Sequence, residues 1–313
     1  MEPLARRVTP HGGLDLRLTL APLRRGPADP TLRFSADGSA WRATRTPDGS
    51  ATLRLVPDGA SLRAEAWGPG AAWAIDQAPE LVGALDDAAG FVAALAGHPL
   101  LRSLHARFPG IRVGRTRRVL EALVPAIIEQ KVTGDEARSA FVALVRRHGE
   151  PAPGPWNETS PPRPAPMFVL PSAATLAGLP GYAYHPLGLE RRRADAIRFA
   201  AARAVRVEGC ADLALPDAYA RLRALPLVGA WTAAEVGLRA LGDADAVSVG
   251  DFHLCHAVCL ALAGEPRGTD ERMLELLARF AGHRARVVRL IEAAGIHAPR
   301  RGPRMAPRSI REI

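Results

Sequence analysis

The sequence predicts a mainly α protein of two domains, in which an antiparallel α+β domain precedes an all-α domain. Up to about residue 100, apolar and polar residues alternate in short runs separated by Asp-Gly pairs, which is typical of half-buried strands joined by hairpin turns. From residue 115 onward, apolar residues recur at intervals of three and four, the spacing of amphipathic helices. The 313 residues suffice for two domains, and 48% of them are hydrophobic, so a buried core is expected.

The first domain is expected to span residues 1–104. Strands are predicted where the alternation is clearest, at residues 14–20, 31–36, 40–46, 51–56 and 61–67. The turns are predicted at the Asp-Gly pairs 37–38, 48–49 and 58–59. A helix over residues 79–100 is expected to follow the sheet. No chemistry is assigned to this domain.

The second domain is expected to span residues 105–298. Its helices are predicted at residues 117–132, 136–148, 192–206, 216–225, 232–241, 252–263, 270–280 and 284–294. Seven prolines in residues 151–166 exclude regular helix there, so this segment is interpreted as a stiff surface loop. Residues 299–313 contain five arginines and three prolines and are expected to form an irregular basic tail.

The net charge of +9 favours a polyanionic partner. A genome rich in arginine codons would give the same excess, because Lys131 is the one lysine among 41 basic residues. The three cysteines imply no disulfide framework and fit a reducing cytoplasm. The sequence has no uncharged apolar run of about eighteen residues, so no membrane span is predicted. The N-terminus lacks the apolar core of a signal peptide, and a cytoplasmic protein is expected.

Residues 225–254 form the most informative segment of the chain. Pro226 and Gly229 predict a tight turn, after which residues 232–241 have helical spacing. Gly242 stands where a helix commonly ends in the left-handed region. Asp251 precedes the apolar residues of the next helix, so its carboxylate is expected at a helix N-terminus, where backbone amides and the helix dipole stabilise negative charge.

This segment resembles the helix-hairpin-helix motif of the base-excision DNA glycosylase superfamily, in which a hairpin and a Thr-Ala pair precede a catalytic aspartate. Three upstream segments, 107–112, 126–133 and 188–194, match further motifs in the family's order, so the resemblance covers about residues 105–295. Within the superfamily the chain is similar to bacterial alkylpurine (3-methyladenine type II) DNA glycosylases. The resemblance implies a monomeric, nucleoid-associated enzyme that removes alkylated purines from duplex DNA by hydrolysing the N-glycosidic bond, with no required cofactor.

The resemblance places Asp251 at the catalytic position. Departure of a base builds positive charge on the sugar, which a nearby carboxylate stabilises while it orients a water molecule. The alternative is a helix N-cap without catalytic function. Asp243 and Asp245 lie in the preceding loop and match no catalytic position.

The resemblance also implies that the hairpin and the helix after it, including Leu227, Val228, Gly229 and Thr232, grip a DNA phosphate. A monovalent cation bound by hairpin carbonyls is compatible with this role. Leu227 replaces the first glycine of the family's motif. If that position requires a positive φ, the leucine is strained; if it does not, the hairpin has been reshaped.

Trp231 occupies the position at which bifunctional relatives carry a Schiff-base lysine, so a monofunctional enzyme is predicted. Its ring either stacks on a flipped cationic base or packs the hairpin into the core. Phe252 is expected to line the same pocket because it adjoins Asp251. Glu235, one helical turn after Trp231, either faces that pocket or is a solvated helix residue.

Gln130 and Lys131 end a predicted helix that lies near the DNA minor groove in related enzymes. There the residue after the glutamine supplies an apolar wedge, whereas Lys131 offers a charged side chain that can bind phosphate or fill the vacated space. Both residues are therefore predicted to contact DNA.

Other polar clusters have simpler interpretations. His253, Cys255, His256 and Cys259 look like metal ligands by spacing, but helical geometry separates them, so buried thiols are favoured and no metal is predicted. The basic clusters at 191–193 and 283–286 either contact phosphates or are solvated helix faces. The loop that contains Tyr182, Tyr184 and His185 could reach a base pocket.

Two alternative functions stay open. Leu227 and Lys131 would also fit a helix-hairpin-helix DNA-binding protein that lacks catalysis, and the motifs would also fit a glycosylase for oxidised or mismatched bases.

Overall fold

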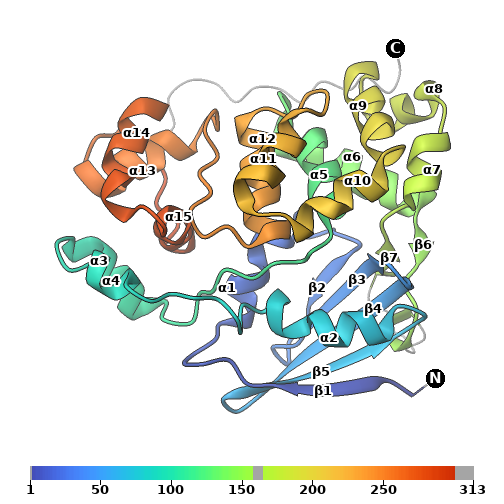
Figure 1. Cartoon of the computed structure of the whole chain (residues 1–313), viewed down its shortest axis with the longest axis horizontal. Helices are drawn as coiled ribbons and strands as arrows, with labels where there is room; N and C mark the ends of the chain where they lie inside the picture. The colour runs from blue at the N-terminus through green and yellow to red at the C-terminus, as the bar shows by residue number, and fades with distance from the viewer. Residues whose placement is uncertain (1, 158–164, 300–313) are drawn as a thin grey trace.

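The computed structural model describes residues 2–157 and 165–299. Residues 158–164 of the predicted proline-rich loop and 300–313 of the predicted basic tail lie outside the described residues. Figure 1 shows an N-terminal antiparallel sheet beside a larger group of helices, so the predicted fold class is confirmed. Within the described residues, none of the helices is long and apolar enough to cross a membrane.

The sheet has five antiparallel strands in the order β1-β5-β4-β3-β2. Its strands are β1 (Leu4–Val8), β2 (Leu32–Phe34), β3 (Ala40–Thr46), β4 (Gly49–Asp58) and β5 (Ser61–Trp67). The Asp-Gly pairs lie at the turns as predicted, and Gly38, Gly49 and Gly59 all have positive φ. Helix α2 (Ala71–Leu81) packs against β1, β4 and β5 and covers the apolar face of the sheet (Figure 1).

Two predictions in the first domain are wrong. The segment predicted as a strand at 14–20 forms helix α1 (Leu16–Leu20), because the Asp15 side chain accepts the Leu18 amide and caps the helix. The single helix predicted at 79–100 is three helices: α2, α3 (Phe91–Ala94) and α4 (Pro99–Arg107). Gly83 and Gly90, at φ of 66° and 79°, take left-handed conformations that a continuous helix does not allow.

The remaining helices form two hydrophobic clusters. The first is built mainly from α5 (Val119–Ile128), α6 (Gly134–His148), α7 (Ala173–Gly178), α8 (Gly181–Tyr184), α9 (Arg191–Ala201), α10 (Ala204–Glu208), α11 (Leu215–Arg223) and α12 (Ala230–Val236). The second is built from α3, α4, α13 (Leu254–Ala263), α14 (Asp270–Leu277) and α15 (Arg284–Ala293). Thus α3 and α4, which the predicted boundary at residue 104 largely assigns to the first domain, share their core with the C-terminal helices (Figure 1).

Several helix boundaries in the second domain differ from those predicted. The helix predicted at 117–132 ends at Ile128, because Lys131 has a φ of 55° and cannot continue a right-handed helix. The helix predicted at 192–206 is divided into α9 and α10 at Arg203, whose φ is −116°. Helices α7 and α8 were not predicted. The described ends of the proline-rich loop are joined by a short ladder between β6 (Glu150–Pro151) and β7 (Phe168–Val169).

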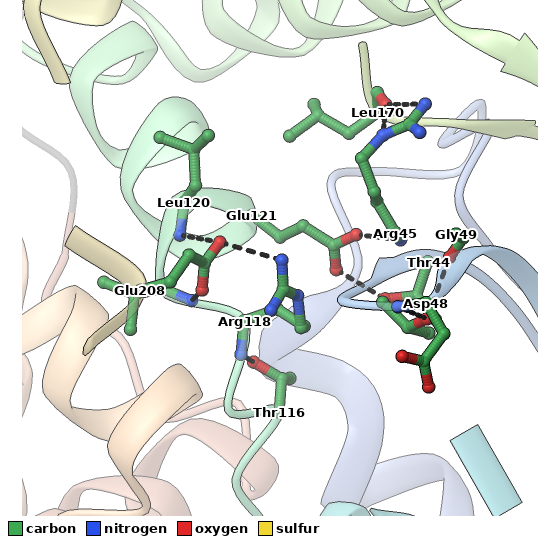
Figure 2. A network of polar contacts seen from close by, with 12 residues as sticks. Thr44, Arg45, Asp48, Gly49, Thr116, Arg118, Leu120, Glu121, Leu170 and Glu208 are labelled. Carbon is green, nitrogen blue, oxygen red and sulfur yellow. Dashed lines mark hydrogen bonds and ion pairs between the residues drawn. The ribbon is translucent and has the colours of Figure 1, made fainter. Parts of the chain in front are cut away.

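A partly buried carboxylate joins the sheet to the helical domain. Glu121, in the first turn of α5, accepts hydrogen bonds from the Arg45 amide (2.6 Å) and the Thr44 hydroxyl (2.8 Å), as Figure 2 shows. The same carboxylate forms an ion pair with the Arg42 guanidinium at 2.8 Å. Because the buried charge of Arg42 is tolerated only when it is paired, this contact holds α5 on the sheet.

The N-terminus of α5 is capped from a distant helix. Glu208, at the end of α10, accepts the backbone amides of Val119 (2.8 Å) and Leu120 (3.3 Å) and pairs with Arg118 at 3.1 Å (Figure 2). Burial raises the pKa of Glu208 above its usual value, although Arg118 and the amide hydrogen bonds oppose this shift. Helix α5 is thus held at its first turn, and its other end leads to Gln130 and Lys131.

Candidate active site

The loop between α12 and α13 connects the two helical clusters and carries Asp251. One carboxylate oxygen, Oδ1, accepts the amides of His253 (2.8 Å) and Leu254 (2.9 Å) at the start of α13. Asp251 therefore caps the helix as predicted, and the contacts orient its side chain. The other oxygen, Oδ2, is left for a different contact, so a capping function and a catalytic function do not exclude each other.

Trp231 faces this second oxygen. Its indole Nε1 lies 3.4 Å from Asp251 Oδ2 and donates a hydrogen bond to it. Trp231 is the second residue of α12 and is half-buried, so the ring is neither fully packed in the core nor free in solvent. This contact joins the first residues after the hairpin to the candidate catalytic carboxylate, across 20 positions of sequence.

Two further acidic side chains hold the Asp251 loop. Ser248 donates its hydroxyl hydrogen to Glu235 at 2.6 Å, and its carbonyl accepts the Asp251 amide at 3.2 Å. Asp270, in the first turn of α14, accepts the Gly250 amide at 2.9 Å. Ser248 and Asp270 were not among the predicted site residues, because their partners are distant and neither stands in a recognisable motif.

Glu235 was predicted either to face the base pocket or to be a solvated helix residue. In the structure it is buried and forms an ion pair. Its carboxylate lies 2.6 Å from the Arg239 guanidinium and 2.6 Å from the Ser248 hydroxyl. Burial would raise the pKa of Glu235, but Arg239, the Ser248 hydrogen bond and Arg25 together lower it below its usual value. Glu235 is therefore an ionised support of the Asp251 loop rather than a solvated helix residue.

The hairpin runs from the end of α11 to Gly229, which precedes α12. Leu227 has a φ of 62°, so the predicted alternative of a strained leucine holds. A side chain in this region costs about 1–2 kcal/mol relative to the right-handed region. Val228 is buried in the first helical cluster, whereas Gly229 is exposed and extended, with a φ of −87°. Exposed backbone at this position would be open to a phosphate.

Gln130 fixes the strained hairpin from the neighbouring loop. Its side-chain amide donates to the Leu227 carbonyl at 2.8 Å and to the Thr232 hydroxyl at 2.7 Å. Thr232 is buried, so Gln130 and Thr232 stabilise the hairpin from within. Lys131 is exposed and, like Leu227, left-handed, with a φ of 55°. The loop that contains Lys131 and the hairpin therefore form one hydrogen-bonded unit.

Phe252 directly follows Asp251 and is 77% exposed. Its ring meets the His253 ring edge-on at 4.9 Å between centroids. Cys255 and Cys259 are buried in the second helical cluster, as their pattern predicted, and burial raises the pKa of both thiols. In residues 2–157 and 165–299, no group of three or more histidine, cysteine, aspartate or glutamate side chains could hold a metal ion.

Several other candidates have structural functions. Asp243 accepts the Tyr219 hydroxyl hydrogen at 2.6 Å, and Asp245 pairs with Arg284. Arg193 is buried and donates to the Ile128 carbonyl at 2.7 Å.

The remaining candidates divide between the interior and the surface. Arg286 is buried and paired with Asp86. Arg193 and Arg286 are thus neither solvated nor accessible to phosphate, which corrects both predicted interpretations of those positions. Tyr184 is fully buried with its hydroxyl bound to Leu176, so it cannot reach a base, whereas Tyr182 is exposed.

The hairpin, the helix after it and Asp251 at the start of the next helix lie in the arrangement that the sequence resemblance implies. No protein-family model matches the sequence. The chain is 30% identical over 169 residues to the probable bifunctional transcriptional activator/DNA repair enzyme AlkA of Mycobacterium tuberculosis. The match covers 54% of this chain, which spans about a third (32%) of the length of that relative.

Solved structures share the fold over nearly the whole chain. A 3-methyladenine DNA glycosylase from Archaeoglobus fulgidus is 21% identical, with a TM-score of 0.77 and coverage of 93% of this chain and 98% of that one. An 8-oxoguanine glycosylase/lyase from Clostridium acetobutylicum is 12% identical, with a TM-score of 0.68 and the same coverage of both chains. The resemblance to the helix-hairpin-helix glycosylase superfamily predicted from the sequence is therefore confirmed.

Proposed function

We propose that this protein is a monofunctional DNA glycosylase that hydrolyses the N-glycosidic bond of alkylated purines in duplex DNA and acts as a monomer. The observation that carries the proposal is the fixed position of the Asp251 carboxylate, with Oδ1 bound by two amides and Oδ2 beside the Trp231 indole. The similarity to AlkA and to a 3-methyladenine DNA glycosylase supports base excision as the activity and alkylated purines as the substrate.

In the proposed reaction Asp251 acts on the sugar of a flipped nucleotide. As the bond between sugar and base breaks, positive charge develops on the sugar ring, and a preorganised carboxylate stabilises it. The same carboxylate orients a water molecule for attack on the sugar, giving a free base and an abasic site. Because the capping amides fix the carboxylate beforehand, little reorganisation is needed during the reaction.

Trp231 supports both the proposed substrate and the absence of lyase activity. Alkylation at a ring nitrogen leaves a purine cationic, and an indole face attracts a cation by stacking and cation–π contact. The indole also occupies the place where a Schiff-base lysine would stand, so no amine is supplied there for strand cleavage. Phe252, exposed beside Asp251, would supply a second aromatic surface.

Duplex binding is assigned to the hairpin and to Lys131. The exposed backbone at Gly229 would bind one phosphate, and the exposed ammonium group of Lys131 would bind another or occupy the space left by the flipped base. Gln130 and Thr232 support this surface from within, through their hydrogen bond to each other and the contact of Gln130 with the Leu227 carbonyl. The hairpin carbonyls remain the proposed place for a monovalent cation.

The decisive experiment measures release of methylated bases from alkylated duplex DNA by wild type and by Asp251→Asn. Asparagine keeps an oxygen that can accept the capping amides, so the fold should survive, while the single-turnover rate should fall about a hundredfold to a thousandfold. Equal rates would remove Asp251 from the mechanism. No release by wild type would favour the DNA-binding protein without catalysis.

A panel of duplexes with alkylated, oxidised and mismatched bases tests the proposed substrate. Preferential release of an oxidised or mismatched base would show that alkylated purines are not the preferred substrate. Borohydride trapping of a protein–DNA adduct with strand nicking would contradict the monofunctional assignment.

A further inference from the structure

Arg25, in the N-terminal domain, projects a buried charge between two segments of the candidate active site. The residue is 8% exposed, and its Nη1 lies 2.7 Å and 3.0 Å from the two carboxylate oxygens of Glu129. Its backbone amide donates to Asp29 at 2.6 Å, which fixes the start of the side chain. Glu129 directly follows α5 and directly precedes Gln130, the residue that holds the hairpin.

The same N-terminal segment also reaches the support of the Asp251 loop. The Pro22 carbonyl accepts a hydrogen bond from Arg239 Nε at 2.8 Å, and Arg239 in turn pairs with Glu235 at 2.6 Å. The pKa of Arg25 lies below its usual value, mainly because the side chain is buried and also because Arg239 is near. The carboxylates of Glu129 and Glu235 oppose this shift. The side chains of Arg25 and Arg239 also line one cavity, so Arg25 lies beside the partner of Glu235 as well as pairing with Glu129.

Each carboxylate leads to one functional segment. Glu129 adjoins the loop that contains Gln130 and Lys131. The side-chain amide of Gln130 donates hydrogen bonds to the Leu227 carbonyl and the Thr232 hydroxyl. Glu235 holds Ser248, whose carbonyl accepts the Asp251 amide. The N-terminal domain therefore contacts both functional segments, through the Arg25–Glu129 ion pair on one side and through Pro22, Arg239, Glu235 and Ser248 on the other.

We propose that Arg25 is a positioning residue through which the N-terminal domain sets the spacing between the loop that contains Lys131 and the loop that carries Asp251. The inference rests on the proposed glycosylase function and gives the N-terminal domain a part in it. Removing the guanidinium leaves Glu129 without its ion pair and takes a positive charge from the cavity that Arg25 shares with Arg239, the ion-pair partner of Glu235, so both segments should shift. Displacements of about 1 Å at a reacting centre can lower a rate about a hundredfold.

Arg42 provides a matched control. It is also a buried arginine of the N-terminal domain, 7% exposed, and pairs with a carboxylate of α5 across the same interface, Glu121 at 2.8 Å. Glu121, however, is in the first turn of α5, eight positions before Glu129. Arg25→Met and Arg42→Met should both lower the free energy of unfolding, whereas only the former acts on the two functional loops.

The test compares single-turnover base release at saturating alkylated duplex for wild type, Arg25→Met, Arg42→Met and Arg25→Lys. We expect Arg25→Met to react about tenfold to a hundredfold more slowly, Arg42→Met to stay within about twofold of wild type, and Arg25→Lys to recover most of the rate because the charge is retained. Equal rates for the two methionine variants would overturn the inference.

Hydrogen exchange of the DNA-free proteins separates this inference from the proposed function. Arg25→Met should accelerate amide exchange in residues 129–133 and 245–254, and Arg42→Met should not. If wild type releases no base, the proposed function fails, yet the exchange comparison still decides whether Arg25 holds the two loops. Identical exchange in both variants would reject the positioning role.

Discussion

The loop that carries Asp251 and the hairpin that precedes α12 are fixed in opposite ways. In the Asp251 loop, left-handed backbone falls on Gly242 and Gly250, which adopt it without strain. In the hairpin it falls on Leu227, and in the adjoining loop on Lys131, where a side chain makes it costly.

The supports of the two loops differ as well. Carboxylates of Glu235 and Asp270, on two different helices, accept hydrogen bonds from the Asp251 loop. Among the described residues, the side-chain hydrogen bonds to the hairpin and to Thr232 after it come from one residue, Gln130, which makes two contacts. The Asp251 loop is therefore held by several contacts and has no strained backbone. The hairpin, which is proposed to bind DNA, has a strained residue, Leu227, whose carbonyl is held by Gln130.

The largest effect is expected from removing that one residue. Gln130→Leu leaves the Leu227 carbonyl and the buried Thr232 hydroxyl without their partner and should lower the free energy of unfolding by about 2 kcal/mol. Since the strained hairpin would then relax, affinity for undamaged duplex DNA should fall. Urea unfolding and a DNA titration measure the two effects.

Gln77→Leu is the control for this prediction. Gln77 is buried and donates its side-chain amide to the Arg115 carbonyl, a contact that includes no hairpin residue. The control should lose similar stability but keep its DNA affinity. Equal loss of affinity in both variants would mean that Gln130 acts only on the general stability of the fold.

A smaller effect is expected at the better supported loop. Ser248→Ala removes one hydrogen bond to Glu235, while Asp270 still holds the Gly250 amide. The free energy of unfolding should fall by about 1 kcal/mol, with a smaller loss of rate than in Asp251→Asn. A rate loss as large as that of Asp251→Asn would contradict the idea that the loop has independent supports.

The ionisation of Glu235 should make this support sensitive to acid. Because Arg239, Ser248 and Arg25 hold the pKa of Glu235 below its usual value, its contribution is complete above the unfolded pKa and is lost as the pH falls through the lower folded pKa. The difference in unfolding free energy between wild type and Glu235→Gln should therefore shrink as the pH falls from 6 to about 3. A constant difference over that range would argue against an ionised Glu235 in the folded protein.

The placement of Asp251 could be predicted from sequence because it depends on local signals. Gly250 and the apolar spacing after Asp251 define a helix N-terminus within a few residues. Similar local signals, the Asp-Gly pairs, placed the turns of the sheet. Residues 14–20 show the limit of such patterns, because their alternation also fits a short helix once Asp15 caps it.

The functions of Gln130 and Glu235 could not be predicted in this way. Gln130 lies 97 positions before its partner Leu227, and Glu235 lies 13 positions before Ser248. A glutamine or a glutamate carries no sequence signal that tells whether its side chain will contact another part of the protein, DNA or solvent. The contact of Arg25 with Glu129 could not be predicted for the same reason, since the two residues are 104 positions apart.

The smallest expected effect has the opposite sign to the others. Lys131 is exposed and left-handed, so Lys131→Gly removes backbone strain without removing buried contacts and should raise the free energy of unfolding by about 1 kcal/mol. The same change removes a proposed phosphate contact, so the slope of log affinity against log salt concentration should fall by about 1. Lys131→Ala, which loses the charge but keeps the strain, should change the slope alone. If Lys131→Gly is no more stable than Lys131→Ala, the left-handed backbone at Lys131 does not destabilise the folded protein, and the prediction is wrong.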